Sequence, residues 1–175
     1  MDYRDELIEN PEKGAERLVA DFGNRLYEVA RKLCLNESDA EDLEFRTLAR
    51  AIEKISSFNG KSSLYTWMYS IMMNIRRMDL RSKGSRVLVL GEELSSLEDE
   101  GPDPGEAFAK EVEAGLLRRV VSELPENLRL VVVFRYFEDL SMNEIAKILD
   151  VPAGTVRFRL FAAKKIIRKK IIQTF

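Results

Sequence analysis

The sequence predicts an all-α protein, built as two small helical domains joined by an acidic flexible linker. Apolar residues recur at three- and four-residue spacing through most of the 175 residues. No proline occurs between Pro11 and Pro102, which leaves a long stretch free to be helical. Residues 84–115 then carry two basic and nine acidic side chains and contain a turn-forming Pro-Asp-Pro-Gly run. We therefore expect domains at 1–83 and 113–175, with the linker at 84–112.

The composition argues against most catalytic chemistry. The chain has no histidine and one cysteine, Cys34, which excludes His-dependent catalysis, His-containing metal sites, an intramolecular disulfide and a Cys-based zinc site. An acidic cluster could suggest a magnesium-dependent phosphohydrolase, but its carboxylates point around a helix and do not converge. The cluster is Glu37, Asp39, Glu41, Asp42 and Glu44. We expect no enzyme activity, no catalytic residue, no metal and no cofactor.

The chain start lacks the apolar core of a secretory signal, and no apolar run approaches membrane-spanning length. Together with the single cysteine, which fits a reducing compartment, this predicts a cytoplasmic protein without membrane insertion.

The N-terminal domain is expected to contain three or four helices. A buried helical face is predicted for Leu18, Phe22, Leu26, Val29 and Leu33. A capping box at Ser38 and Glu41 should start the next helix, whose inner positions are Leu43, Thr47, Leu48, Ala51, Ile52 and Ile55. After an interruption at 58–61, a third helix should span about 63–82. Its predicted inner stripe is Leu64, Met68, Ile71, Ile75 and Met78.

The outer stripe of this third helix has an unusual composition. At 100° per residue, one face carries Trp67, Ser70, Asn74, Arg77 and Arg81. An aromatic ring, an amide and guanidinium groups can stack on an unpaired base, bond its edge and hold its phosphates. Alternatively, Trp67 lies at the edge of the core and the arginines only solvate the surface of the helix. The spacing alone favours this alternative.

The C-terminal domain carries a stronger pattern. Ser141 and Glu144 form a capping box for a short helix with Ile145, Ala146 and Leu149 facing inward, residues 150–154 form a turn, and Thr155 should cap a second helix. The inner face of that helix is Val156, Leu160, Ala163 and Ile167. From Thr155 to Phe175 there are seven basic residues and no acidic one, which favours a DNA-binding helix-turn-helix over a plain helical hairpin. By periodicity, residues 128–137 could be a buried strand or a buried helix.

The second helix of this motif offers candidate DNA contacts. Lys165 and Lys169 are suited to phosphates, and Thr155, Arg157 and Arg159 to base edges. An exposed Phe158 could meet a thymine methyl. The alternative for Phe158 and Phe161 is packing against the preceding helix or another protein.

Three segments resemble the extracytoplasmic-function (ECF) sigma factors, the compact promoter-recognition subunits of bacterial RNA polymerase. The segment ELPENLRLVVVFRYFEDLSMNEIAKILDVPAGTVRFRL (123–160) looks like the family's fourth conserved region. The segments DAEDL (39–43) and SSLYTWMYSIMMN (62–74) are similar to its second region. This resemblance implies that 128–137 is helical, and that the chain is an alternative sigma factor that melts the minus-10 element and reads the minus-35 element. It also implies core RNA polymerase, promoter DNA and an anti-sigma factor as partners.

The resemblance assigns roles to particular residues. Core polymerase binding is expected from Asp39, Asp42, Leu43, Thr47 and Leu48. Capture of the minus-10 strand is expected from Phe58, Asn59, Lys61, Ser62, Trp67, Ser70, Asn74, Arg77 and Arg81. Contact with the minus-35 duplex is expected from Thr155, Val156, Arg157, Phe158, Arg159, Ala162, Lys165 and Lys169. A simple duplex-binding helix-turn-helix regulator is the alternative function, and it would give Trp67 no role.

Overall fold

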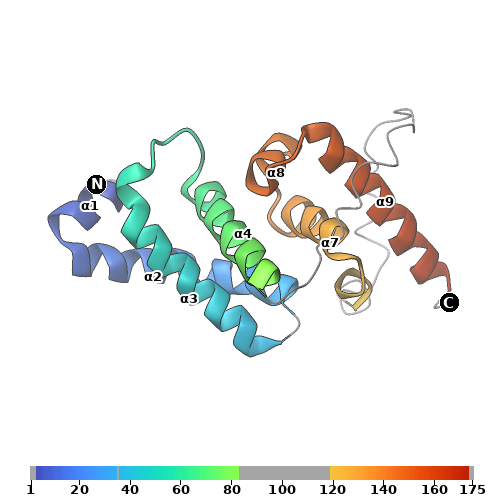
Figure 1. Ribbon diagram of the computed structural model, residues 1–175, viewed down its shortest axis with the longest axis horizontal. Coiled ribbons are helices and arrows are strands. Elements are labelled where there is room, and N and C mark those ends of the chain that lie inside the picture. The colour runs from blue at the N-terminus through green and yellow to red at the C-terminus, as the bar shows by residue number, and fades with distance from the viewer. Residues whose placement is uncertain (1–2, 35, 83–118, 174–175) are drawn as a thin grey trace.

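The computed structural model describes residues 3–34, 36–82 and 119–173, and within these ranges every regular element is helical (Figure 1). This confirms the all-α class. The predicted linker lies outside the described residues, and the boundaries 1–83, 84–112 and 113–175 stay predictions.

The N-terminal helices are α1 (Tyr3–Glu9), α2 (Pro11–Leu33), α3 (Glu37–Lys54) and α4 (Leu64–Ser82), with a short 3₁₀ turn η1 (Ile55–Ser57) after α3. The predicted apolar face of α2 is confirmed, since all five of its residues are buried. The α2 helix starts with Pro11 at a position where a missing N–H costs nothing, and the Asn10 side chain accepts a hydrogen bond from the Lys13 N–H.

Two details of the N-terminal prediction were wrong. Helix α3 is capped by Asn36, whose Oδ1 accepts from the Asp39 N–H at 2.8 Å, so the Ser38–Glu41 capping box does not form. Met78 is 61% exposed. The buried row of α4 contains Met68, Met72 and Ile75, and the next position of this row at helical spacing is residue 79. Asp79 therefore faces α3, and Met78 does not.

The C-terminal helices are α7 (Glu126–Val132), a π-helical turn η2 (Val133–Phe137), α8 (Met142–Leu149) and α9 (Ala153–Ile172). Residues 128–137 are therefore helical, as the resemblance implied. The π turn closes with the Glu138 N–H bonded to the Val133 carbonyl at 3.2 Å. The next residue, Asp139, has a left-handed φ of 52°, which ends the helix.

The helix-turn-helix of α8 and α9 matches the prediction in its core. The capping box of Ser141 and Glu144 forms with both reciprocal bonds, and the α9 inner face of Val156, Leu160, Ala163 and Ile167 is buried. Asp150 turns the chain at a left-handed φ of 55°. The predicted cap at Thr155 was wrong, because α9 already begins at Ala153 after Pro152 and Thr155 lies inside its first turn.

The two groups of helices pack against each other. Helix α4 lies along α8, and α2 touches α7, so α4 occupies the middle of the molecule (Figure 1). The apolar residues of both groups form one buried cluster.

Candidate nucleic-acid interface

An aromatic pair marks the N-terminal end of α4. The rings of Phe58 and Trp67 lie 5.3 Å apart with 49° between their planes, and both are half-buried. Phe58 belongs to the segment between η1 and α4, where Gly60 takes a φ of 71° and the exposed Asn59 accepts a hydrogen bond from the Lys61 N–H. The structure thus brings the predicted loop and the predicted helix together into one aromatic surface.

The polar residues on this face of α4 differ in their availability. Asn74 and Arg81 are exposed. Ser70 is half-buried, and its hydroxyl donates a hydrogen bond to the Thr66 carbonyl at 3.1 Å. Arg77 donates to the Asn74 Oδ1 at 3.0 Å and to the Leu149 carbonyl of α8 at 2.6 Å. Ser62 is half-buried and donates to the Ser63 carbonyl. The face is continuous along the helix, but Arg77 is turned toward α8.

Helix α9 presents a cationic surface. Arg157, Lys165 and Lys169 are exposed, as a phosphate- or base-contacting role requires. Four further candidates are half-buried and lie at the edge of that surface: Thr155, Phe158, Arg159 and Ala162. Burial lowers the pKa of Arg159. The side chain of Val156 is fully buried in the core, and its expected contact with the minus-35 duplex stays a prediction.

Aromatic residues flank this cationic surface. Phe161 is 57% exposed on α9, and the Lys164 ammonium lies 5.7 Å from the ring centroid of Tyr136. Phe161 is thus not packed against the preceding helix. Of the two packing alternatives given for it, contact with another protein stays open.

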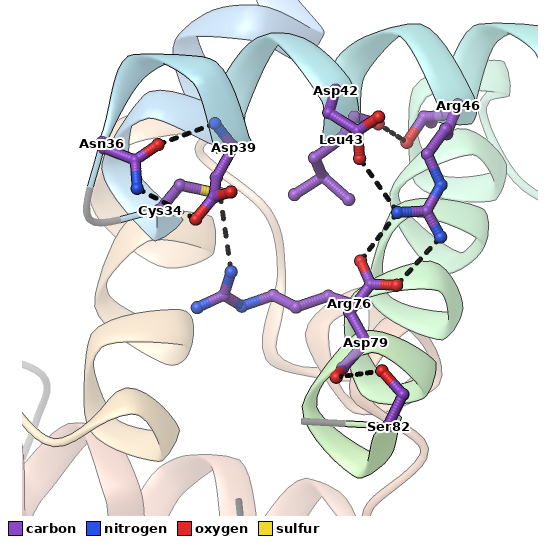
Figure 2. Close-up of polar contacts among 10 residues, drawn as sticks. Cys34, Asn36, Asp39, Asp42, Leu43, Arg46, Arg76, Asp79 and Ser82 are labelled. Atoms are coloured by element: carbon purple, nitrogen blue, oxygen red, sulfur yellow. Dashed lines mark hydrogen bonds and ion pairs between the residues drawn. The ribbon is translucent and has the colours of Figure 1, made fainter. Parts of the chain in front are cut away.

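The third candidate surface is the solvent side of α3. Asp39 and Asp42 are exposed there, as expected for partner contact (Figure 2). The other residues expected to serve polymerase binding are buried in the domain core, and their role stays a prediction: Leu43, Thr47 and Leu48. The Thr47 hydroxyl donates to the Leu43 carbonyl at 2.6 Å, which satisfies it within its own helix.

Arg46 links this surface to α4. Its guanidinium bonds the Asp42 carboxylate at 2.9 Å and both carboxylate oxygens of Asp79 at 2.9 Å (Figure 2). The hydrogen bonds with Asp79 and then Asp42 raise the pKa of Arg46. Asp42 therefore presents a partly neutralised charge.

Sequence reasoning missed Phe45, which is 69% exposed on α3. The signal was available: Leu43 and Thr47 set the inward side of the helix, and residue 45 is 200° from each of them. An aromatic side chain at this exposed position is the type of residue that anchors protein–protein contacts.

Cys34 lies at the end of α2, half-buried beside Arg76. The Arg76 guanidinium donates to its sulfur at 3.5 Å, and burial raises the pKa of the thiol (Figure 2).

Within the described ranges, no group of three or more Cys, Asp or Glu residues is arranged to hold a metal ion. Among the same residues, no helix combines the length and the apolarity needed to cross a membrane.

The fold and these three surfaces define a helical DNA-binding protein with a helix-turn-helix. Two family models match the chain: Sigma-70 region 2 over residues 18–86 and Sigma-70, region 4 over residues 114–167. The ECF RNA polymerase sigma-E factor of Haemophilus influenzae is 30% identical over 94% of this chain and 93% of its own length. The RNA polymerase sigma-H factor of Pseudomonas aeruginosa is 27% identical over 95% of this chain and 92% of its own.

Solved structures agree on the fold. The sigma factor RpoE in complex with the anti-sigma factor NepR from Bartonella quintana matches with a TM-score of 0.66 at 21% identity, over 88% of this chain and 94% of that one. CnrH in complex with the cytosolic domain of CnrY matches with a TM-score of 0.66 at 18% identity, over 98% and 96%.

The chain therefore belongs to the sigma-70 family, within its ECF group. It is an alternative sigma factor, which directs promoter-specific transcription. The simple duplex-binding regulator is not favoured, because the match to region 2 covers the N-terminal helices that such a regulator would leave without a role.

Proposed function

We propose that the three surfaces divide the work of transcription initiation. The α4 face and the 58–63 segment capture one strand of the minus-10 element, α9 reads the minus-35 duplex, and the solvent side of α3 binds core RNA polymerase. The observation that carries this proposal is the Phe58–Trp67 pair, 5.3 Å apart, which joins the loop to the polar face of α4.

Strand capture follows from the chemistry of the α4 face. A base that leaves the duplex loses its stacking, and an aromatic surface such as Phe58–Trp67 replaces about 1–3 kcal/mol of it. Asn74 is exposed next to this surface and has both donors and acceptors for a base edge. Arg81, exposed about two turns further along the helix, suits the backbone phosphate.

Duplex reading is assigned to the first half of α9, with Arg157 as the exposed candidate for a base edge. Lys165 and Lys169 lie further along the same helix and are exposed, so they supply sequence-independent phosphate contacts. The capped α8 and the buried inner face of α9 hold this helix rigidly on its domain.

Polymerase binding is assigned to Asp39, Asp42 and Phe45, the residues of α3 that solvent reaches. Because Leu43, Thr47 and Leu48 are buried, their role is to hold the helix in place. The charged pair and the aromatic ring together give a contact with an apolar centre and a polar rim.

The remaining parts of the proposal concern the cellular setting. The complexes of RpoE with NepR and of CnrH with CnrY support an anti-sigma factor as a further partner. We place the protein in the cytoplasm, where core polymerase and promoter DNA are found. It performs no covalent chemistry of its own.

The test is reconstituted initiation with core polymerase on a promoter selected from genomic fragments by the transcripts that this chain starts. Trp67→Ala should reduce open-complex formation about 5- to 150-fold, the equivalent of 1–3 kcal/mol of lost stacking, while co-elution with polymerase is retained. The control is Met78→Ala, which removes an exposed apolar side chain from the same helix. Equal open-complex formation by Trp67→Ala and Met78→Ala would refute the assignment of the minus-10 surface.

A further inference from the structure

The segment between η1 and α4 contains an asparagine followed by a glycine, Asn59–Gly60. Of the seven asparagines in the chain, only Asn59 precedes a glycine. Asn59 and Gly60 are both exposed and lie outside every regular element of the described chain. The pair is therefore open to solvent and free of helical constraint. The other six asparagines cap a helix or lie within one: Asn10, Asn24, Asn36, Asn74, Asn127 and Asn143.

An asparagine can react with the backbone nitrogen of the next residue. At this pair, the Gly60 nitrogen would lose its proton and attack the Cγ of Asn59, and the new N–C bond would close a succinimide ring. The bond from Cγ to Nδ2 breaks, and the side-chain nitrogen leaves as ammonia. Water then adds to either ring carbonyl and opens the ring to aspartate or isoaspartate. One water is consumed and one ammonia is released, so the reaction needs no oxidant and no cofactor.

Gly60 suits the attacking role. Its N–H donates no hydrogen bond within the described chain, so no such bond has to break before the attack. No heavy atom beyond the chain neighbours lies within 4 Å of the position that a β-carbon would take at Gly60, and the glycine has no side chain to obstruct the approach. Its φ of 71° lies in a region that glycine occupies without strain. The backbone nitrogen can therefore turn toward the Asn59 amide at low cost.

The backbone of Lys61 assists the reaction. Its N–H donates to the Asn59 Oδ1 at 3.1 Å. Negative charge develops on this oxygen when Cγ becomes tetrahedral, so the hydrogen bond strengthens as the reaction proceeds. A donor already aimed at that oxygen lowers the barrier to ring closure. The segment thus exposes the Asn59 amide and also polarises it.

We propose that Asn59–Gly60 is a self-modification site, which converts over time to aspartate or isoaspartate and thereby places a carboxylate in the 58–63 segment. The conversion is a property of the chain alone. Its effect on initiation rests on the function proposed above.

The products would change the proposed strand-capturing surface. Lys61 is the only charged residue among 58–63, so a new carboxylate cancels the net charge of the segment. The isoaspartate form also lengthens the main chain by one carbon. Both ends of the segment are tied to helices, because the Phe58 N–H bonds a carbonyl of η1 at 3.0 Å and the Trp67 N–H bonds the Ser63 carbonyl at 3.1 Å. The added length must be accommodated beside the aromatic pair, and both products should weaken strand capture.

The first experiment follows the conversion in the purified chain by mass spectrometry. The chain is incubated in mildly alkaline buffer prepared with heavy-oxygen water and cut with trypsin, which releases residues 55–61 by cleavage after Lys54 and Lys61. This peptide should change by the mass of an NH2 group replaced by OH, with the heavy oxygen taken from solvent. It should separate into aspartate and isoaspartate forms. The rate should rise with pH, because the Gly60 nitrogen must lose its proton.

Asn36 is the internal control for this measurement. It is exposed, and its Oδ1 also accepts a backbone hydrogen bond, from the Asp39 N–H at 2.8 Å, but the next residue is Glu37 at the start of α3. Asn36 should convert at least about tenfold more slowly, because its reaction would undo a helix cap. Asn59→Gln should stop the conversion of 55–61, since its reaction would need a larger ring. Absence of heavy oxygen from this peptide, or equal rates at Asn59 and Asn36, overturns the proposed site.

The second experiment measures open-complex formation with core polymerase by freshly purified variants. Asn59→Asp reproduces the charge of the product and should reduce open-complex formation about fivefold, as expected for a like charge about 4 Å from a phosphate in water. The deficit should shrink as salt is added. The matched control is Asn10→Asp, which adds the same charge at an exposed helix cap far along the sequence and should leave open-complex formation unchanged.

Equal open-complex formation by Asn59→Asp and Asn10→Asp would overturn the effect on initiation. Absence of open complexes with the fresh, unaltered chain would instead contradict the proposed function, and the peptide measurement would still decide whether Asn59 converts.

Discussion

Arg46 of α3 and Asp79 of α4 form a paired contact, with Nη1–Oδ2 and Nη2–Oδ1 both at 2.9 Å. The two-pronged geometry fixes the rotation of one helix against the other more firmly than a single bond would. Because α3 carries the proposed polymerase surface and α4 the proposed strand-capturing face, this pair sets the relative position of two functional surfaces.

The pair should contribute modestly to stability, since both side chains are more than one-third exposed. A double-mutant cycle of Arg46→Met and Asp79→Asn is expected to show a coupling of about 0.5–1 kcal/mol, measured by urea unfolding. Raising the ionic strength should shrink the coupling. The cycle of Arg50 and Glu53, an exposed pair within α3, serves as the reference and should give a smaller value. Equal couplings would show that Arg46 does not tie the helices together.

Phe45 should be a main contact for polymerase. Phe45→Ala is expected to weaken the affinity for core polymerase at least about fivefold, because truncating an anchoring aromatic costs more than about 1 kcal/mol. Its effect on folding should be small, as the ring is 69% exposed. Ile8→Ala removes an apolar side chain of similar exposure from α1 and should leave the affinity unchanged. If the two variants bind polymerase equally well, Phe45 lies outside the contact.

Lys165 should contact a DNA phosphate. Lys165→Ala is expected to lower the slope of log affinity against log salt by about one for duplex binding, since one fewer counterion is released. The measurement is fluorescence anisotropy across a salt series. Lys13→Ala, an exposed lysine of α2, is the control and should keep the original slope. A full slope in Lys165→Ala would place the DNA elsewhere on α9.

The capping box of α8 should make stability depend on pH. Hydrogen bonds from the Ser141 side chain and backbone lower the pKa of Glu144 below its ordinary value of 4.5. A lowered folded-state pKa means that the carboxylate stabilises the fold above pH 4.5, and that this contribution is lost as the pH falls below it. Glu144→Gln should therefore cost about 0.5–1 kcal/mol at neutral pH and less in acid.

Chemical unfolding at neutral pH and near pH 3.5 measures both values for Glu144→Gln. The comparison variant is Glu41→Gln on α3, a carboxylate that was expected to cap a helix and does not. A Glu144→Gln deficit that persists unchanged in acid would assign the effect to side-chain shape instead of charge.

Much of the fold followed from periodicity because buried faces repeat regularly. The inner faces of α2 and α9 were predicted residue by residue, and both are buried as expected. Helix starts were less predictable, because a periodic pattern does not fix the residue at which a helix begins. Asn36 caps α3 in place of Ser38, and α9 already begins at Ala153, directly after Pro152.

The candidate site was harder to predict for a different reason. Motif resemblance assigns a role to a position, but burial decides whether the side chain can perform it. Val156 and Thr47 lie within recognisable motifs and are buried. Phe45 lies in the same helix as Thr47 but on its opposite side, and it is exposed although no motif marks it. The Arg77–Leu149 contact joins residues 72 positions apart, and no local pattern encodes it.

The position of the Glu138 side chain depends on the number of residues in the π-helical turn of Val133–Phe137. A turn closed over five residues holds one residue more than an α-helical turn, so every side chain beyond it is rotated by about 100° relative to a regular helix. Deletion of one residue from this turn would let an ordinary α-helix form, and the apolar residues before the turn would keep their positions. The carboxylate of Glu138 would then point away from Arg25 and Tyr69. A change in length that alters no charge would thus remove the contacts by which Glu138 joins the C-terminal helices to the N-terminal helices.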